Sequence, residues 1–249
     1  MQVEFVGVGE AFDENLPNNS QILQWQSCRL LIDCGYAVPH ALWKAHPDPE
    51  YLDAIYISHR HADHYFGLPS VLVRLAEDKR EKPLIIFCAE GTQSTLLEMI
   101  EYAYQGILPK IKYEIQFQEV TTREPFAFRE ARMEFAVSSH PVKNYAIAIY
   151  ADGRKYAYSG DGNFNAHTRR LYHGCSLLVH DSYAFGFEVH GHAQIPELVT
   201  MAEEEKIERL ALTHIQRDVR RTRLREVKDF VRHSPVDVII PEPGDVLEV

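Results

Sequence analysis

Six residues that follow an apolar run constrain this chain more than any other feature of its sequence. Residues 59–64 read HRHADH and come directly after DAIYIS at residues 53–58, a run that predicts a buried strand. Three imidazoles and one carboxylate in so short a loop can fold around one point, and together they suit a borderline divalent ion such as zinc. The alternative is a polar surface loop that happens to be rich in histidine, and the spacing H-x-H-x-D-H makes it a poor account.

Three more candidate ligands lie at the ends of other strand-like segments. They are His140 after the run FAVSS, Asp161 after KYAYSG, and His214 after LALT. Sheets of α/β proteins present their functional groups at the carboxyl ends of strands. One histidine in such a place is usually structural, but three such positions alongside the cluster at residues 59–64 favour a shared metal site.

Taken in order, these residues resemble the full ligand series of the metallo-β-lactamase superfamily. The series is His59, His61, Asp63, His64, His140, Asp161 and His214. Residues 1–9 (MQVEFVGVG) also resemble its opening strand and glycine turn, and residues 29–35 (RLLIDCG) resemble its L-L-I-D-x-G segment. Within the superfamily the chain is most similar to the ribonuclease Z and phosphodiesterase branch, since true β-lactamases commonly have cysteine at the position of Asp161.

The resemblance implies one α/β domain over residues 1–249, a four-layer αββα metallo-β-lactamase-like sandwich with its metals at one edge between two sheets. It also implies two divalent ions. The ligands of the first ion would be His59, His61 and His140, and those of the second would be Asp63, His64 and His214. Asp161 would contact both ions. Asp63 would also be catalytic, because it would orient the hydroxide between the ions or take its proton. Zinc is the first expectation, although five histidines and two aspartates also accept manganese or iron.

A second polar segment supports phosphate chemistry. The run LLVHDS at residues 177–182 predicts a strand with a polar end, and HGHA follows at residues 190–193. Ribonuclease Z has a strand ending in His-Glu before a Gly-His-Ser-Thr motif, so the resemblance makes His192 the catalytic general acid and phosphate ligand, with Asp181 orienting it. The chain has Asp181 for Glu and Ala-Gln for Ser-Thr. The alternative is a plain loop before a helix, and His190 is a substitute candidate.

Charge and the length of one interval limit the substrate. The formal net charge is −10, so the chain gains little from long-range attraction to nucleic acid. Residues 65–139 read as helices and strands, without the glycine-rich basic arm with which ribonuclease Z enzymes grip tRNA. We therefore expect a small anionic ester, above all a phosphodiester such as a cyclic nucleotide, a nucleotide conjugate or a short oligonucleotide, and tRNA is a poor candidate. A run of arginines either meets this substrate or forms a solvated helix face: Arg217, Arg220, Arg221, Arg223 and Arg225.

The remaining patterns concern location and assembly. There is no run of eighteen apolar residues and no basic stretch followed by an apolar one at the start, so we expect a cytoplasmic protein with no membrane span. The four cysteines form no C-x-x-C pair and read as reduced, buried thiols: Cys28, Cys34, Cys88 and Cys175. Homodimers are frequent in the resembling branch, and a homodimer is one expectation here.

Hydrophobic patterning predicts alternating strands and helices in one domain without a linker. The predicted strands are residues 3–8, 21–26, 29–33, 54–58, 83–88, 111–117, 132–137, 144–150, 155–158, 177–182, 209–213, 236–240 and 246–249. The predicted helices are residues 68–78, 92–104 and 195–206, and a further one after His214. The sequence thus predicts an α/β fold.

The function expected from these features is metal-dependent hydrolysis of a phosphodiester by a hydroxide that bridges two metal ions. The same hydroxide attacks thioesters, lactones and sulfate esters, and loops that the motif does not encode decide between these substrates. A metal-binding protein without catalysis is a third hypothesis. Iron in the same ligands would serve oxygen chemistry, but no flavin-binding domain accompanies the motif.

Overall fold

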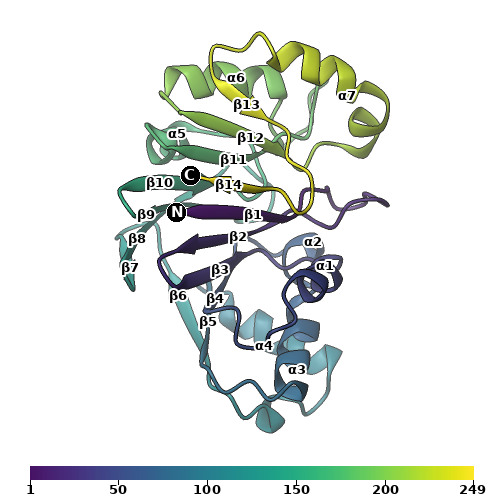
Figure 1. Cartoon of the computed structure of the whole chain (residues 1–249), viewed down its shortest axis with the longest axis vertical. Coiled ribbons are helices and arrows are strands. Elements are labelled where there is room, and N and C mark those ends of the chain that lie inside the picture. Colours follow the sequence, from purple (N-terminus) through teal and green to yellow (C-terminus); the bar gives the residue numbers. More distant parts are fainter.

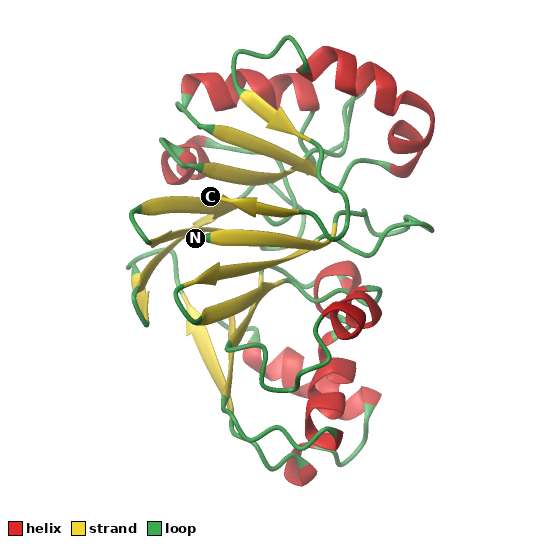
Figure 2. Ribbon diagram, in the orientation of Figure 1, coloured by secondary structure: helices red, strands yellow, loops and turns green.

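Two seven-stranded β-sheets lie face to face in the computed structural model, which describes residues 1–249, and helices cover the outer face of each sheet (Figure 1, Figure 2). The first sheet has the order β14 (Val246–Glu248), β1 (Gln2–Gly7), β2 (Ser20–Trp25), β3 (Cys28–Ile32), β4 (Ala54–Ile57), β5 (Leu84–Ala89) and β6 (Ile115–Val120). The second has the order β13 (Asp237–Ile239), β12 (Arg209–Thr213), β11 (Leu177–Asp181), β10 (Arg154–Tyr158), β9 (Tyr145–Ala151), β8 (Ala131–Val137) and β7 (Phe126–Phe128). The predicted αββα sandwich is confirmed.

Each sheet has its own layer of helices. Those beside the first sheet are α1 (Val38–Ala45), α2 (Ala62–Tyr65), α3 (Leu68–Glu77) and α4 (Gln93–Ala103), with a 3₁₀ turn at Leu108–Lys110. Those beside the second are α5 (Ala166–Tyr172), α6 (Ile195–Glu204) and α7 (Arg217–Val231). None of these helices is both long enough and apolar enough to cross a membrane.

Both sheets follow one plan, in which antiparallel pairing at one side changes to parallel pairing at the other. In the first sheet β3, β4, β5 and β6 are parallel, and in the second sheet β10, β11, β12 and β13 are parallel. Parallel neighbours end at the same edge of a sheet, and ligands of α/β proteins bind at that edge. The plan therefore delivers polar residues from distant parts of the chain to one place.

The apolar side chains fall into three layers that hold this plan rigid. A cluster of 27 buried residues fills the space between the sheets, and it includes Trp25, Tyr56 and Tyr158. Clusters of 20 and 19 buried residues lie under the two helical layers. Because burying a large apolar side chain contributes about 1.5–3 kcal/mol, these layers fix the strand ends on which the site is built.

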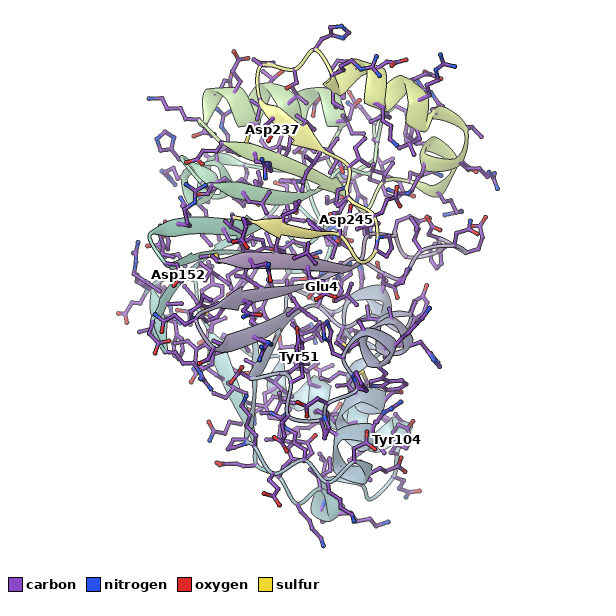
Figure 3. All side chains as sticks on the ribbon, in the orientation of Figure 1. Glu4, Tyr51, Tyr104, Asp152, Asp237 and Asp245 are labelled. Atoms are coloured by element: carbon purple, nitrogen blue, oxygen red, sulfur yellow. The ribbon has the colours of Figure 1, made fainter.

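The two chain ends join the halves at the middle of the sandwich. β14 pairs antiparallel with β1, so the C-terminus completes the first sheet after the chain has finished the second. The amino group of Met1 lies 3.2 Å from Oδ2 of Asp152, in the turn between β9 and β10 of the other sheet. Figure 3 shows Asp152 at the left of the molecule, with Asp237 near the top and Tyr104 near the bottom.

The predicted strands and helices appear within about two residues of their expected bounds, apart from one shift and several omissions. The strand expected at residues 111–117 instead spans Ile115–Val120, because the chain first makes a 3₁₀ turn around Pro109. Patterning missed α1, α2, α5 and β7, which are short. α5 had a local signal, since Asn165 and Thr168 form a capping box at its start.

Candidate metal centre

All seven residues predicted as metal ligands meet at one edge between the two sheets. They come from the segment after β4, from α2, and from the ends of β8, β10 and β12: His59, His61, Asp63, His64, His140, Asp161 and His214. Their potential ligand atoms form two groups that share Asp161, and within each group these atoms lie within 4.8 Å of one another. The fold thus brings together side chains that are up to 155 positions apart in the sequence.

The first group combines His59, His61 and His140 with Asp161. His61 and His140 are only half-buried, and His140 Nε2 lies 3.1 Å from His61 Nδ1. His140 Nδ1 lies 2.9 Å from the carbonyl oxygen of Gly191, which can only accept a hydrogen bond. The proton of a neutral His140 therefore sits on Nδ1, and the lone pair of Nε2 points to the centre of the group.

The second group combines Asp63, His64 and His214 with Asp161, and every member is buried. His64 Nε2 lies 3.2 Å from Asp63 Oδ2 and 3.2 Å from Asp161 Oδ1. His214 Nε2 lies 3.3 Å and 3.5 Å from the Oδ2 atoms of the same two carboxylates. His214 also has a positive φ of 56°, a conformation that is rare for residues other than glycine and that often marks functional sites.

The donor set fits divalent cations. His59 Nε2, His64 Nε2 and Asp161 Oδ1 are buried, and no hydrogen bond satisfies them. A buried polar atom left without a partner destabilises the fold by about 1–3 kcal/mol. Three such atoms in one cluster therefore favour a bound cation over a purely structural role. Imidazole and carboxylate donors arranged in this way suit zinc, manganese or iron.

The carboxylates of the second group control the protonation of its histidines. Burial lowers the pKa of His64, but Asp161 and Asp63 outweigh burial and hold it well above its ordinary value. Burial also lowers the pKa of His214, and Asp161 again brings the pKa well above normal. In the first group, by contrast, burial and the neighbouring His64 hold the pKa of His59 well below normal. The carboxylates thus make His64 and His214 more basic than His59.

Asp33 is a residue of this site whose role the sequence analysis missed. Its carboxylate is fully buried and accepts hydrogen bonds from Ser58 N, Ser58 Oγ and Tyr158 Oη, each at 2.7 Å. Its Oδ2 also lies 2.7 Å from His64 Nδ1. Such a partner fixes the ring of a ligating histidine and increases its basicity. The available signal was an aspartate at the end of the apolar run RLLI.

His192 lies beside the second group, and its ring contacts Asp181, the residue that the sequence led us to expect as its orienting partner. His192 Nδ1 is 2.8 Å from Asp181 Oδ2, and its ring stacks parallel to that of His214, with centroids 5.8 Å apart. Burial lowers the pKa of His192, but the bond to Asp181 outweighs burial and raises it above normal. His190 is exposed and belongs to none of these groups.

His192 lines two cavities, and the other residues that line them differ. The aromatic cavity has a volume of about 330 Å³, and it takes its walls from Phe12, Tyr36 and Tyr183 together with several of the candidate ligands. The polar cavity has a volume of about 780 Å³, and it is lined by two carboxylates and two amides: Glu188, Glu197, Asn163 and Gln194. A substrate at the metal centre can extend into either one.

Four of the five arginines after His214 face carboxylates along α7 or beyond it and have no contact with the candidate ligands. The pairs are Arg220 with Glu242, Arg221 with Asp218, Arg223 with Glu226, and Arg225 with Asp229. Arg217 differs, because its Nη1 lies 2.7 Å from Oε1 of Glu10, a residue of the aromatic cavity. The solvated helix face is therefore the better description of Arg221, Arg223 and Arg225, whereas the side chain of Arg220 is only 9% exposed.

Comparison with known proteins shows where this chain belongs. The profile of the family described as Anti-Pycsar protein Apyc1 matches residues 1–235. The chain belongs to the Anti-Pycsar protein Apyc1 family. The relative of that name from Paenibacillus harenae is 31% identical over 217 residues, which cover 82% of this chain and 85% of the relative.

More distant relatives confirm the wider resemblance. A ribonuclease Z from Anoxybacillus flavithermus is 23% identical over 274 aligned positions, which cover 86% of each chain. The crystal structure of the metallo-β-lactamase fold protein YhfI from Bacillus subtilis superposes with a TM-score of 0.83 at 22% identity and covers 100% of this chain and 99% of that one. The predicted fold and the likeness to ribonuclease Z are thus both confirmed, and this chain is a metal-dependent hydrolase.

Proposed function

We propose that this chain is a dinuclear phosphodiesterase whose substrate is a cyclic mononucleotide. The observation that carries the proposal is the position of Asp161, whose carboxylate belongs to both histidine-rich groups. One carboxylate shared in this way fits two ions that it would bridge. Two bound divalent ions would lower the pKa of a water molecule and stabilise the charge of the phosphate during an in-line displacement.

The proposed ligands are those that the sequence predicted, with zinc as the first candidate ion. His59, His61 and His140 would hold one ion, Asp63, His64 and His214 would hold the other, and Asp161 would contact both. Outer partners support both sets, since Asp33 contacts His64 and the Gly191 carbonyl contacts His140. Partners of this kind typically change metal affinity by about 10- to 100-fold when removed.

Two residues of the chain would handle the protons. Burial raises the pKa of Asp63, but His64 and His214 outweigh it and lower the pKa, so the carboxylate stays ionised at neutral pH and could orient the attacking water by accepting a hydrogen bond. His192 has a raised pKa and lines both cavities, so it can hold a proton near neutral pH and donate it to the leaving oxygen. Asp181 would keep the His192 ring in position through its 2.8 Å contact.

The size and charge of the chain support a small substrate. Between residues 65 and 139 the chain forms α3, β5, α4, β6, β7 and β8, which are all part of the sandwich, and no separate arm extends from it. The aromatic cavity of about 330 Å³ is at the small end of ligand pockets, and the net charge of −10 disfavours a long polyanion. The family name, Anti-Pycsar, also points to a cyclic nucleotide.

A neutral acyl ester is the second candidate substrate, and one observation favours it. No arginine or lysine lines the aromatic cavity, and the neighbouring Arg217 is paired with Glu10, so apart from the candidate metal ligands His192 is the one side chain there that can offer a phosphate a positive charge. Thioesters and lactones would need no such charge. In the phosphodiesterase account, the ions themselves neutralise the phosphate.

The test is hydrolysis of bis(p-nitrophenyl) phosphate by the purified protein with added zinc or manganese, with the Asp161→Ala variant as the blank. The proposal predicts metal-dependent turnover that the blank lacks, and turnover of cyclic mononucleotides under the same conditions. A protein that binds two ions per chain but cleaves p-nitrophenyl acyl esters and no phosphodiester would support the acyl-ester alternative. A protein that binds the ions and cleaves neither would be a binding protein.

A further inference from the structure

The loop between β1 and β2 displays an aromatic ring at the mouth of the aromatic cavity. Phe12 is 72% exposed although it is one of the large apolar residues of the chain, and it lines the cavity together with Asp63 and His192. Tyr36, which lines the same cavity, is 47% exposed, and apolar side chains exposed together beside polar groups are typical of ligand-binding surfaces. Contacts of the residues around Phe12 hold its backbone in the position that exposes the ring.

Three contacts fix the backbone on which Phe12 stands. Glu10 is only 1% exposed, and its Oε2 accepts a hydrogen bond from Phe12 N at 2.9 Å. Its other oxygen, Oε1, accepts from Arg217 Nη1 at 2.7 Å, which ties the loop to the first residue of α7. The hydroxyl of Tyr36 donates to the carbonyl oxygen of Ala11. The ring of Phe12 is therefore held at the mouth in advance, and little order has to be gained on binding.

We propose that the nucleobase of the substrate stacks on Phe12 in the aromatic cavity, with Tyr36 and Tyr183 as its walls, while the phosphate lies at the metal centre. This deepens the proposed function and rests on it. Every base has a π-face that can stack on an aromatic ring, so a cavity with three aromatic residues next to a phosphate-binding centre fits a nucleotide. The guanidinium of Arg217 lies 5.9 Å from the centroid of Phe12 and adds to the stack.

The polar cavity, which His192 also lines, is the less suitable place for a base. Glu188 and Glu197 give it negative charge, and the one hydrophobic residue in its lining is Val189. A base placed there would find imidazole rings but no phenyl or phenol ring to stack on, and any further phosphate would meet two carboxylates. The contrast between the cavities assigns the base to the aromatic one.

The experiment compares two substrates that differ only in the base. One is a 3′,5′-cyclic mononucleotide and the other is methyl riboside 3′,5′-cyclic phosphate, which has a methoxy group in place of the base. Stacking on one aromatic side chain corresponds to about a five- to hundredfold preference for the base-bearing substrate, seen mainly in KM. Phe12→Ala should abolish most of this preference, and Phe12→Trp should keep it.

A matched control variant separates the loss of stacking from a general effect of removing an exposed aromatic side chain. Tyr102 is another exposed aromatic residue, 91% exposed on α4, and Tyr102→Ala should leave the preference as in the natural chain. If Phe12→Ala keeps the full preference, or raises KM equally for both substrates, the inference is wrong while the phosphodiesterase assignment stands. If the natural chain binds two ions but cleaves neither cyclic phosphate nor bis(p-nitrophenyl) phosphate, the proposed function is wrong and the inference falls with it.

Discussion

The two histidine-rich groups share a carboxylate but differ in burial and in the partners behind them. His61 and His140 of the first group are half-buried and lie on loops, whereas every residue of the second group is buried. The outer partners of the first group are neutral, such as the Gly191 carbonyl behind His140. Behind the second group stand two buried carboxylates, Asp33 and Asp181.

This difference indicates that the two ion sites have different strengths. A carboxylate behind a ligating histidine increases its basicity and fixes its ring, and a carbonyl oxygen does so less strongly. Ligands in a buried site are also less exposed to water molecules that could replace them at the ion. We therefore expect the second group to bind the first equivalent of metal, and the first group to complete the active centre afterwards. Variants of the shared and outer residues test this difference between the two ion sites, from the largest expected effect to the smallest.

Asp161→Ala should impair both ion sites, because the shared carboxylate belongs to both groups. We expect loss of both bound ions and a fall of phosphodiester hydrolysis to background. Metal analysis of the purified variant beside its turnover rate measures both effects. Asp237→Ala, an exposed position on β13, is the control and should keep ions and rate. A variant that retained full activity would refute the dinuclear assignment.

Asp33→Asn should weaken the second group selectively. The loss of the carboxylate behind His64 is expected to reduce affinity at that group by about 10- to 100-fold. Calorimetric titration with zinc measures the change. Asp53→Asn is the matched control, because Asp53 is an equally buried carboxylate that pairs with Lys82 and Arg129 far from the ligands. That variant should lose stability without a change in metal affinity, and an equal loss of affinity in both variants would contradict the account.

A smaller effect is expected in the order in which the ions leave. During titration with a chelator, the natural chain should release one ion at a concentration about tenfold lower than the other. His140→Ala should remove the weaker step and keep the tighter one, since His140 belongs to the half-buried group. One single release step, or loss of the tighter step in this variant, would show that the two groups are equivalent.

The smallest effect concerns pH. Since His192 must donate its proton, the rate should be constant below its pKa and fall as the pH rises through it. Burial lowers this pKa and the bond to Asp181 raises it, with a net rise. Asp181→Asn should therefore move the falling limb to lower pH and reduce the rate at neutral pH by about tenfold. Profiles of kcat against pH that coincide for the two proteins would remove His192 as the proton donor.

The sequence was informative where chemistry requires particular residues at fixed spacings. The segment 59–64 and the strand ends before His140, Asp161 and His214 predicted the convergence that the fold displays, because parallel strands end at one edge. The fold class followed from the same residues through the family resemblance, and patterning recovered most strands.

Other parts of the site could not be predicted, since they depend on contacts between distant segments. Asp33 contacts Ser58, Tyr158 and His64 only after the strands that carry them have come together, and its place at the end of an apolar run does not say which residues it will contact. The position of Phe12 depends on Glu10 meeting Arg217, which is 207 residues away. Short helices such as α5 lack enough turns for a periodic pattern, and α5 alone among the missed helices had a capping box as a local signal.

The most direct test of a two-ion phosphodiesterase is to follow cyclic mononucleotide hydrolysis while zinc or manganese is added to metal-free protein in known equivalents. The account predicts little turnover up to one equivalent, where the buried group fills, then a steep rise that levels off at two equivalents per chain. Full turnover at one equivalent would contradict the dinuclear mechanism. The absence of turnover at two bound equivalents would contradict the phosphodiesterase assignment.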